Sequence, residues 1–337
     1  MTAFRVALLR GEEELTRGGL EVVDSWQPGS EAKLWVDISD PTQEAIEPLL
    51  EGRFGFHELA AEDTVSPETL PKYDPYPTYD FFVFRAVDVD LGEHASQSYK
   101  LAAFLGGNFL VTVHSELHKR MDEIWERLPG DKRLLGSGAD FLLHAIVDAM
   151  VDEHFPLLEK IDNCVDDVQD AIFTDPRPGQ LDELLHLKRD VNLLRRHSLP
   201  QRDLLNHISR GDAQFISREH LIYFRDVYDH MFRITETIDV QRDAMAGAME
   251  AYLSVIANRT NEIMRVLTVF SAIMLPLSLI AGIYGMNFEH IPELHWIRGY
   301  WYALALMAIV AVGMLVFFRR KGWIGRGADL TRPRARV

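Results

Sequence analysis

Small hydroxyl and apolar side chains recur along one helical face between residues 264 and 282. Successive members are 3, 4, 4, 3 and 4 residues apart, the spacing of one face of an α-helix: Met264, Leu267, Ser271, Leu275, Ser278 and Gly282. Around a symmetry axis such a face would form polar rings and narrow apolar constrictions that line an ion pore. Small residues also favour close helix packing in membranes, so the spacing leaves a pore face and a packing face both open.

An asparagine follows this face directly, at Asn287, two residues after Gly285. A ring of its neutral amide carbonyls would suit a divalent cation that keeps its water shell, as Mg2+ does. Carboxylates in the same place would bind more tightly and release more slowly. Glu289 and Glu293 come next, with no Lys or Arg before Arg298, and predict an outer loop that concentrates cations.

A second feature suited to cations lies in residues 140 to 173, an amphipathic stretch with nine acids and one base, Lys160. The acidic face is either an ordinary solvated surface or a cation-binding one. The whole chain carries 51 acids against 35 Lys and Arg, a formal net charge of −16, which argues against nucleic acid as a partner. Metal cations are the more natural partners.

Two apolar segments must position these residues. No charged side chain occurs in residues 266 to 288 or in residues 299 to 318, and each run meets the ~20 residues that a membrane-spanning helix needs. We expect transmembrane helices over 266–286 and 299–318, joined by an outer loop over 287–298. The alternative is a buried hairpin in a soluble core, although soluble helices of this length normally keep a polar face.

The basic tail over 319–337 orients the predicted spans. It holds seven Lys and Arg against one acid, Asp329, which predicts a cytoplasmic location. Two spans then return the N-terminal part to the cytoplasm, where the absence of a signal-peptide pattern also places it. Trp296 and the aromatic run 300–302 suit the outer membrane interface.

The upstream part is predicted to be an α/β domain over 1–135. Strands are expected at 4–10, 33–39, 80–89 and in a hairpin over 99–115, and helices at 41–53, capped by Asp40, and at 116–128. Acidic paired helices are expected over 136–216, followed by a stalk helix whose cytoplasmic part covers 217–265. If that helix is continuous from Ser217 to Tyr284, its 68 residues measure about 100 Å, and an apolar stripe of that length argues for an oligomer.

An enzyme is not expected. The chain has no phosphate-binding loop, nucleophile elbow or H-E-x-x-H motif. Its one cysteine, Cys164, excludes an intrachain disulfide and any site built from several cysteines.

The stretch YGMNFEHIPEL, residues 284 to 294, resembles the signature of the CorA family of divalent-cation channels. The resemblance extends to YFRDVYDH at 223–230, TNEIMRVLT at 260–268, both spans and the basic tail. It implies a funnel-shaped homopentamer in the plasma (inner) membrane, with an α+β cytoplasmic domain, a long stalk helix and two C-terminal transmembrane helices. The first spans would line the pore, and Gly285, Met286 and Asn287 would form its outer selectivity filter.

The family also implies a sensor, in which intracellular Mg2+ between neighbouring subunits keeps the pore shut. By position in YFRDVYDH, Asp226 is the expected ligand, with Asp88 or Asp90 of the next subunit as its partner. Asp148 is a further candidate metal ligand, and Glu250 would form an acidic ring on the stalk. The plain alternative for each is a solvated surface acid.

The expected function is uptake of Mg2+, and of Co2+, driven by the membrane potential and gated by intracellular Mg2+. The order of preference among Mg2+, Co2+, Ni2+ and Zn2+ stays open. One alternative is a zinc transporter of the same architecture. Another is a membrane-anchored Mg2+ sensor or scaffold that does not conduct, which would have no use for Asn287.

Overall fold

The computed structural model describes residues 2–11, 14–88, 97–115, 119–287 and 296–324. The predicted site residues Asp90, Glu289 and Glu293 lie outside these ranges, and so does most of the loop predicted over 287–298. The chain divides into two compact units, residues 1–250 and 251–337, which are described separately below. Helix α8, Leu221–Tyr284, runs through the boundary between them.

The first unit is built on a seven-stranded sheet in the order β2-β1-β3-β7-β6-β5-β4. Only the β3–β7 pair is parallel among the described pairings, and the other five are antiparallel. The strands are β1 Ala3–Arg10, β2 Glu14–Gly18, β3 Lys33–Ser39, β4 Lys72–Pro75, β5 Asp80–Asp88, β6 Gln97–Leu105 and β7 Phe109–His114. Strands β1, β3, β5, β6 and β7 are rich in β-branched and aromatic residues, and most of their residues are buried because helices cover both faces of the sheet.

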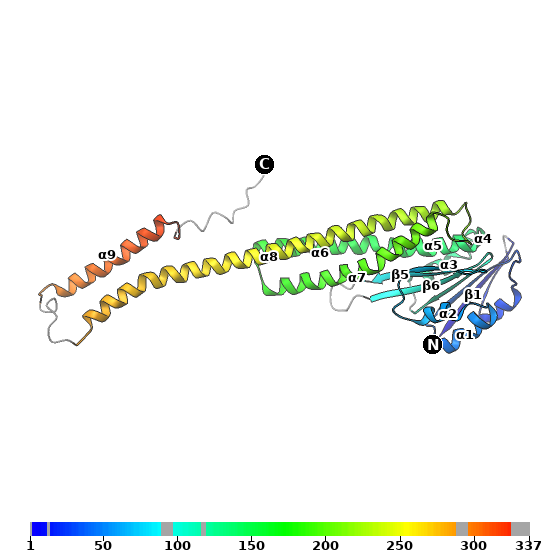
Figure 1. Ribbon diagram of the computed structural model, residues 1–337, viewed down its shortest axis with the longest axis horizontal. Coiled ribbons are helices and arrows are strands. Elements are labelled where there is room, and N and C mark those ends of the chain that lie inside the picture. The colour runs from blue at the N-terminus through cyan, green and yellow to red at the C-terminus, as the bar shows by residue number, and fades with distance from the viewer. Residues whose placement is uncertain (1, 12–13, 89–96, 116–118, 288–295, 325–337) are drawn as a thin grey trace. The chain divides into compact units, whose positions relative to one another are not determined.

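Short helices cover one face of the sheet and long helices the other (Figure 1). The short ones are η1 Leu20–Ser25, α1 Gln43–Glu47, η2 Pro48–Arg53 and α2 Glu58–Val65. The opposite face carries α3 Lys119–Arg127, α4 Arg133–Gly136, α5 Ala139–Asp152, α6 His154–Thr174, α7 Pro178–Ser209 and the first half of α8. Alternate strand residues feed the two cores, so Leu8 faces the short helices while Leu9 faces the long ones.

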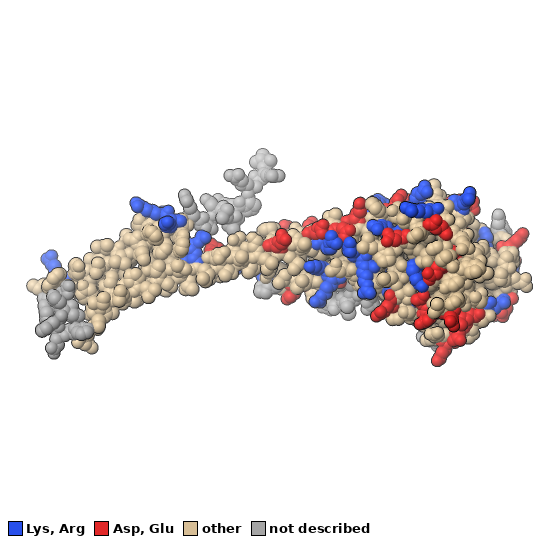
Figure 2. All heavy atoms as spheres, viewed as in Figure 1, with Lys and Arg blue, Asp and Glu red and all other residues tan. Residues whose placement is uncertain are grey.

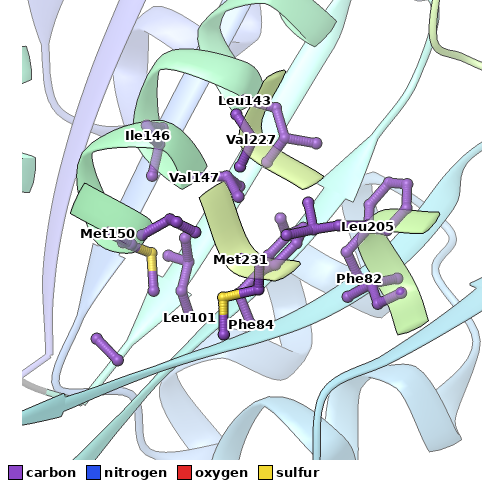
Figure 3. Packing of buried hydrophobic residues seen from close by; sticks show 14 of the residues in the cluster. Phe82, Phe84, Leu101, Leu143, Ile146, Val147, Met150, Leu205, Val227 and Met231 are labelled. Carbon is purple, nitrogen blue, oxygen red and sulfur yellow. The ribbon is translucent and has the colours of Figure 1, made fainter. Parts of the chain in front are cut away.

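Helices α5 and α8 pack together over the sheet. In Figure 3, Val227 and Met231 of α8 lie against Val147 and its neighbours on α5, with Phe84 and other strand residues beneath them. All of these side chains are buried. Because the apolar faces point inward, the opposite faces of α5 and α8 present their polar residues to solvent.

Several elements differ from the sequence-based expectation. Residues 140 to 173 form two helices, because a turn at Glu153 separates α5 from α6. Asp40 is not a helix cap: it takes a positive φ of 50°, and Thr42 stands at the cap of α1. Strands β2 and β4 and helix α2 were not expected, since they are short and lack a strong apolar period.

Helix α8 begins at Leu221, four residues after the expected start at Ser217. Ser217 instead belongs to a polar cluster at the start of α5, where its backbone N–H and hydroxyl both donate to Asp140, at 2.9 and 2.8 Å. Burial opposes ionisation of Asp140, but these bonds and one to His220 outweigh it and lower the pKa of the carboxyl. The chain entering α8 is therefore tied to the start of α5.

The second unit contains the rest of α8 and helix α9, Gly299–Arg320. Both helices are long and apolar enough to cross a membrane. α8 continues through Pro276, which is tolerated in membrane helices because neighbouring groups satisfy the freed carbonyl.

A buried charge network joins the sheet to α3. Asp37 of β3 is inaccessible to solvent and accepts hydrogen bonds from Arg5 at 2.5 Å and from the Thr112 hydroxyl at 2.6 Å. His114 lies 3.3 Å from the same carboxylate, and Arg5 also binds Asp122 of α3 at 2.6 Å. Burial alone would raise the pKa of Asp37, but His114 and then Arg5 outweigh it and lower the pKa.

We expect Asp37→Ala to cost about 3 kcal/mol or more, because it leaves the Arg5 charge without its buried partner. In thermal denaturation of the purified protein this corresponds to a fall in melting temperature of roughly 6–12 °C. Arg10→Ala is the matched control, since it breaks only the exposed Arg10–Glu14 pair and should change the temperature little. Equal melting temperatures for Asp37→Ala and the wild type would contradict this account of the network.

Candidate cation sites

Four potential metal ligands project from two neighbouring helices. Asp148 and Asp152 lie four residues apart on α5, and Asp226 and His230 lie four residues apart on α8. Residues at this spacing share one helical face, so each helix presents its two ligands side by side. The α5–α8 packing brings the two pairs together.

The tightest group consists of Asp148, Asp152 and His230, whose potential ligand atoms all lie within 4.8 Å of one another. The Nδ1 atom of His230 is 3.4 Å from Asp152 Oδ1, and its Nε2 atom is 3.8 Å from Asp226 Oδ2. Two carboxylates and an imidazole form a donor set that fits a divalent cation: the oxygens suit Mg2+, and the imidazole suits Co2+, Ni2+ or Zn2+.

The carboxylates of this group repel one another. The pKa of Asp148 is raised, first by its burial and then by Asp152, with His230 opposing the shift and Asp226 adding to it. Asp226 itself is largely exposed, with 71% of its side chain accessible. A bound divalent cation would remove the repulsion, so ion binding and the charged state of these acids favour each other.

The group opens onto a cleft of about 600 Å3 between α3, α5 and the start of α8. Asp148 and Asp152 line one part of the cleft, and His144, His220 and Tyr223 line another. Burial, followed by the charge of His220, lowers the pKa of His144 to about 4, so this ring is neutral at physiological pH. The candidate cation site is therefore open to solvent at a concave surface.

The structure brings together two of the four predicted regulatory residues, Asp226 and Asp148. Asp88 is the last residue of β5, but its side chain is outside the described part of the chain, as is the whole of Asp90. Glu250 is exposed on α8, 24 residues beyond Asp226, or roughly 36 Å along the helix axis. It is thus separate from the clustered acids.

Two residues of the group, Asp152 and His230, were not selected from the sequence. Their signal was present, because each stands four residues after a predicted ligand. His230 was not selected because isolated histidines usually serve packing or lie solvated at the surface. Only the pairing of α5 with α8, which joins positions 78 residues apart, distinguishes this histidine from the others.

The predicted filter residues follow the end of α8 at Tyr284. Gly285 is not among the glycines with a positive φ; its N–H donates to the Ala281 carbonyl at 2.9 Å. A Cβ at this position would stand 3.0 Å from the same carbonyl, so a larger residue would crowd the last turn. Met286 and Asn287 are exposed beyond it.

The six residues of the predicted pore stripe are also exposed along α8 in the second unit. They are Met264, Leu267, Ser271, Leu275, Ser278 and Gly282. No described side chain of the same chain covers this face, and it remains free for a membrane or for other subunits.

Comparison with known proteins identifies the family that shares this architecture. A family model described as CorA-like Mg2+ transporter protein matches residues 30–320. The chain is 35% identical over 296 residues to the cobalt/magnesium transport protein CorA of Thermotoga maritima, covering 88% of this chain and 84% of that protein. It is 36% identical over 289 residues to the putative metal ion transporter YfjQ of Bacillus subtilis, covering 86% and 89%.

Solved structures share the fold. The complete structure of the CorA magnesium transporter from Methanocaldococcus jannaschii superposes with a TM-score of 0.81 at 20% identity, covering 96% of this chain and 99% of that one. Full-length CmaX gives a TM-score of 0.76 at 23% identity, covering 95% and 97%. Fold and site together define a membrane transporter of divalent cations, with two C-terminal spans. The chain belongs to the CorA-like Mg2+ transporter family, which is a family of transporters and not of enzymes.

We expect Asp148→Asn to raise the melting temperature of the purified protein in EDTA at pH 7. The pKa of Asp148 is higher in the folded protein than in the unfolded chain, so the folded state holds this proton more tightly. The resulting stabilisation is complete below the pKa of the unfolded chain and is lost as the pH rises through the pKa of the folded protein. At neutral pH the ionised Asp148 is therefore destabilising. The variant should gain less stability than the wild type when Mg2+ is added, because a ligand is missing.

Glu159→Gln is the matched control, since it removes an exposed acid on α6 away from the group. It should leave both the melting temperature in EDTA and the Mg2+-induced shift as in the wild type. A lower melting temperature of Asp148→Asn in EDTA would contradict the assigned repulsion.

Proposed function

We propose that the protein is a homopentameric channel that admits Mg2+, and Co2+, through the first spans of its subunits. The exposed stripe of α8 that ends at Asn287 carries this proposal, because it offers a continuous polar and apolar lining with no acid or base. The names of the relatives in Thermotoga maritima and Methanocaldococcus jannaschii, both cobalt/magnesium transport proteins, support the choice of ions.

Gly285, Met286 and Asn287 form the filter in this proposal. Five amide carbonyls at the outer mouth would bind a cation through its water shell, which holds Mg2+ without requiring it to dehydrate. Neutral oxygens release the ion more readily than carboxylates would, and rapid release is necessary for conduction. Leu275 and Leu267 then supply apolar constrictions farther along α8.

Both termini lie in the cytoplasm, and the two spans cross the inner membrane. This orientation rests on the excess of Lys and Arg in the tail over 319–337. The membrane potential drives uptake without ATP: the gain is about 2.3 kcal/mol per charge per 100 mV, and about twice that for a divalent ion.

Intracellular cations close the channel by binding at Asp148, Asp152, Asp226 and His230, together with an acid such as Asp88 or Asp90 from the next subunit. Without the ion, repulsion between carboxylates loosens the contact between subunits and the pore opens. The ion therefore shifts a population between closed and open states, which is negative feedback on uptake. Glu250 contributes an acidic ring that attracts cations leaving the pore.

The alternatives have less support. Zinc transport by the same architecture would draw on the imidazole of His230, but the relatives in Thermotoga maritima and Methanocaldococcus jannaschii are named as cobalt/magnesium transport proteins. The cytoplasmic domain of a ZntB protein matches at 14% identity, which shows the fold alone. A sensor or scaffold that does not conduct would retain the carboxylate group and have no need of Asn287.

We expect Asn287→Ala to abolish Mg2+ entry into proteoliposomes under an inside-negative potential, because the filter loses its carbonyl acceptors. Assembly and Mg2+-induced stabilisation should persist. Fluorescent Mg2+ indicators inside the vesicles report the flux, and Asn258→Ala is the control, because this exposed asparagine of α8 lies off the helical face that carries the stripe. Wild-type flux in Asn287→Ala would remove the filter assignment and favour the non-conducting sensor.

We expect His230→Ala to weaken inhibition by internal cations while leaving flux at low internal Mg2+ unchanged. Loss of one ligand should shift the half-inhibiting concentration by about ten-fold or more for Co2+, and by less for Mg2+, which prefers oxygen. Flux measured at a series of internal concentrations checks this. His186→Ala, an exposed histidine on α7, should behave as the wild type; identical inhibition curves for His230→Ala would exclude the group as the sensor.

A further inference from the structure

Helix α9 ends in three consecutive cations, Arg319, Arg320 and Lys321, all exposed. No acid occurs between Glu293 and Asp329, and none of the three cations forms an ion pair with a described residue. In Figure 2 the apolar length of this helix ends in a group of Lys and Arg atoms. The charge at this end of α9 thus lacks a partner within the described chain.

The backbone after these cations folds an aromatic ring back onto the last turn of α9. Gly322 has a φ of 75°, its N–H donates to the Arg319 carbonyl at 3.1 Å, and the N–H of Trp323 donates to the Phe318 carbonyl at 2.9 Å. This is a Schellman cap, which requires a residue that tolerates positive φ. The rings of Trp323 and Phe318 stack with centroids 5.5 Å apart and planes at 29°.

The cap therefore builds a defined surface, here called the α9 terminal patch: Arg319, Arg320, Lys321 and Trp323. Trp323 keeps 44% of its surface exposed while its inner face covers the buried Phe318. A tryptophan that packs one side of its ring against apolar atoms and exposes the other to water is typical of the membrane interface. The 22 residues of α9 measure about 33 Å, close to the ~30 Å hydrocarbon core, which puts the patch at head-group depth.

We propose that the α9 terminal patch binds the phosphate groups of anionic phospholipids. The guanidinium groups of Arg319 and Arg320 each offer a planar fork for phosphate oxygens, and Lys321 adds a point charge. A lipid head group fits better than free phosphate, because the exposed ring of Trp323 places an apolar surface near the cations, which a lipid can cover and a free anion cannot. The proposal concerns the bilayer and holds whether or not the pore conducts.

The test compares lipid retention by the full chain. Purified protein is equilibrated in detergent with equal amounts of phosphatidylglycerol and phosphatidylcholine, isolated by gel filtration, and its bound lipids are quantified by mass spectrometry. The wild type should retain an excess of phosphatidylglycerol. The triple variant R319Q/R320Q/K321Q should reduce this excess by about five-fold per cation removed, toward equal retention.

Two variants separate the patch from charge in general and from folding. R319K/R320K/K321R keeps the charge and should keep most of the excess, whereas R189Q/R210Q/R218Q removes three exposed arginines of the first unit and should keep all of it. Trp323→Ala should lower phosphatidylglycerol retention with the charge intact, which tests the patch even if the triple variant does not assemble.

Equal retention of the two lipids by the wild type would overturn the proposal. So would an unchanged excess in both the triple variant and Trp323→Ala, which would assign the preference elsewhere. Displacement of phosphatidylglycerol by millimolar inorganic phosphate would show that the patch recognises the free anion and not the lipid.

Discussion

The packing of α8 against α5 is the contact on which the cation site depends. Val227 and Met231 bury one face of α8 against the α5 face that contains Val147. Burial of those faces brings two pairs of side chains together at the solvent side of the same contact. The pairs are Asp148 and Asp152 on α5 and Asp226 and His230 on α8. Hydrophobic burial thus holds like charges together that would separate if the helices were free.

This arrangement stores unfavourable electrostatic energy at a place where an ion can remove it. The raised pKa of Asp148 is the local sign of that energy, and burial and Asp152 are its main causes. By contrast, Asp37 is fully buried yet has a lowered pKa, because His114, Arg5 and Thr112 surround it. The two aspartates show that one fold holds both a compensated charge, which stabilises it, and an uncompensated charge, which in the proposed sensor makes it respond to ions.

The chemistry proposed for the two cation sites follows from what each must do. A filter must release its ion within the time of conduction, so a neutral amide such as that of Asn287 is suited to it. A sensor must remain occupied at the resting ion concentration, so several carboxylates and an imidazole suit it better. Helix α8 links the two sites along the chain, since it includes Asp226 and His230 and ends three residues before Asn287.

The two spans, the long helix before them and most strands could be predicted from the sequence, because each has a strong local pattern of apolar residues or a long charge-free run. The sequence also indicated Asp226 and Asp148 and, through the stretch 284–294, the family. That Asp152 and His230 join them follows from the folded arrangement, since residues of α5 and α8 meet only when both helices bury their apolar faces on one sheet. The folded chain likewise places Trp323 on Phe318, a contact that depends on the backbone turn at Gly322 and leaves no periodic signal in the sequence.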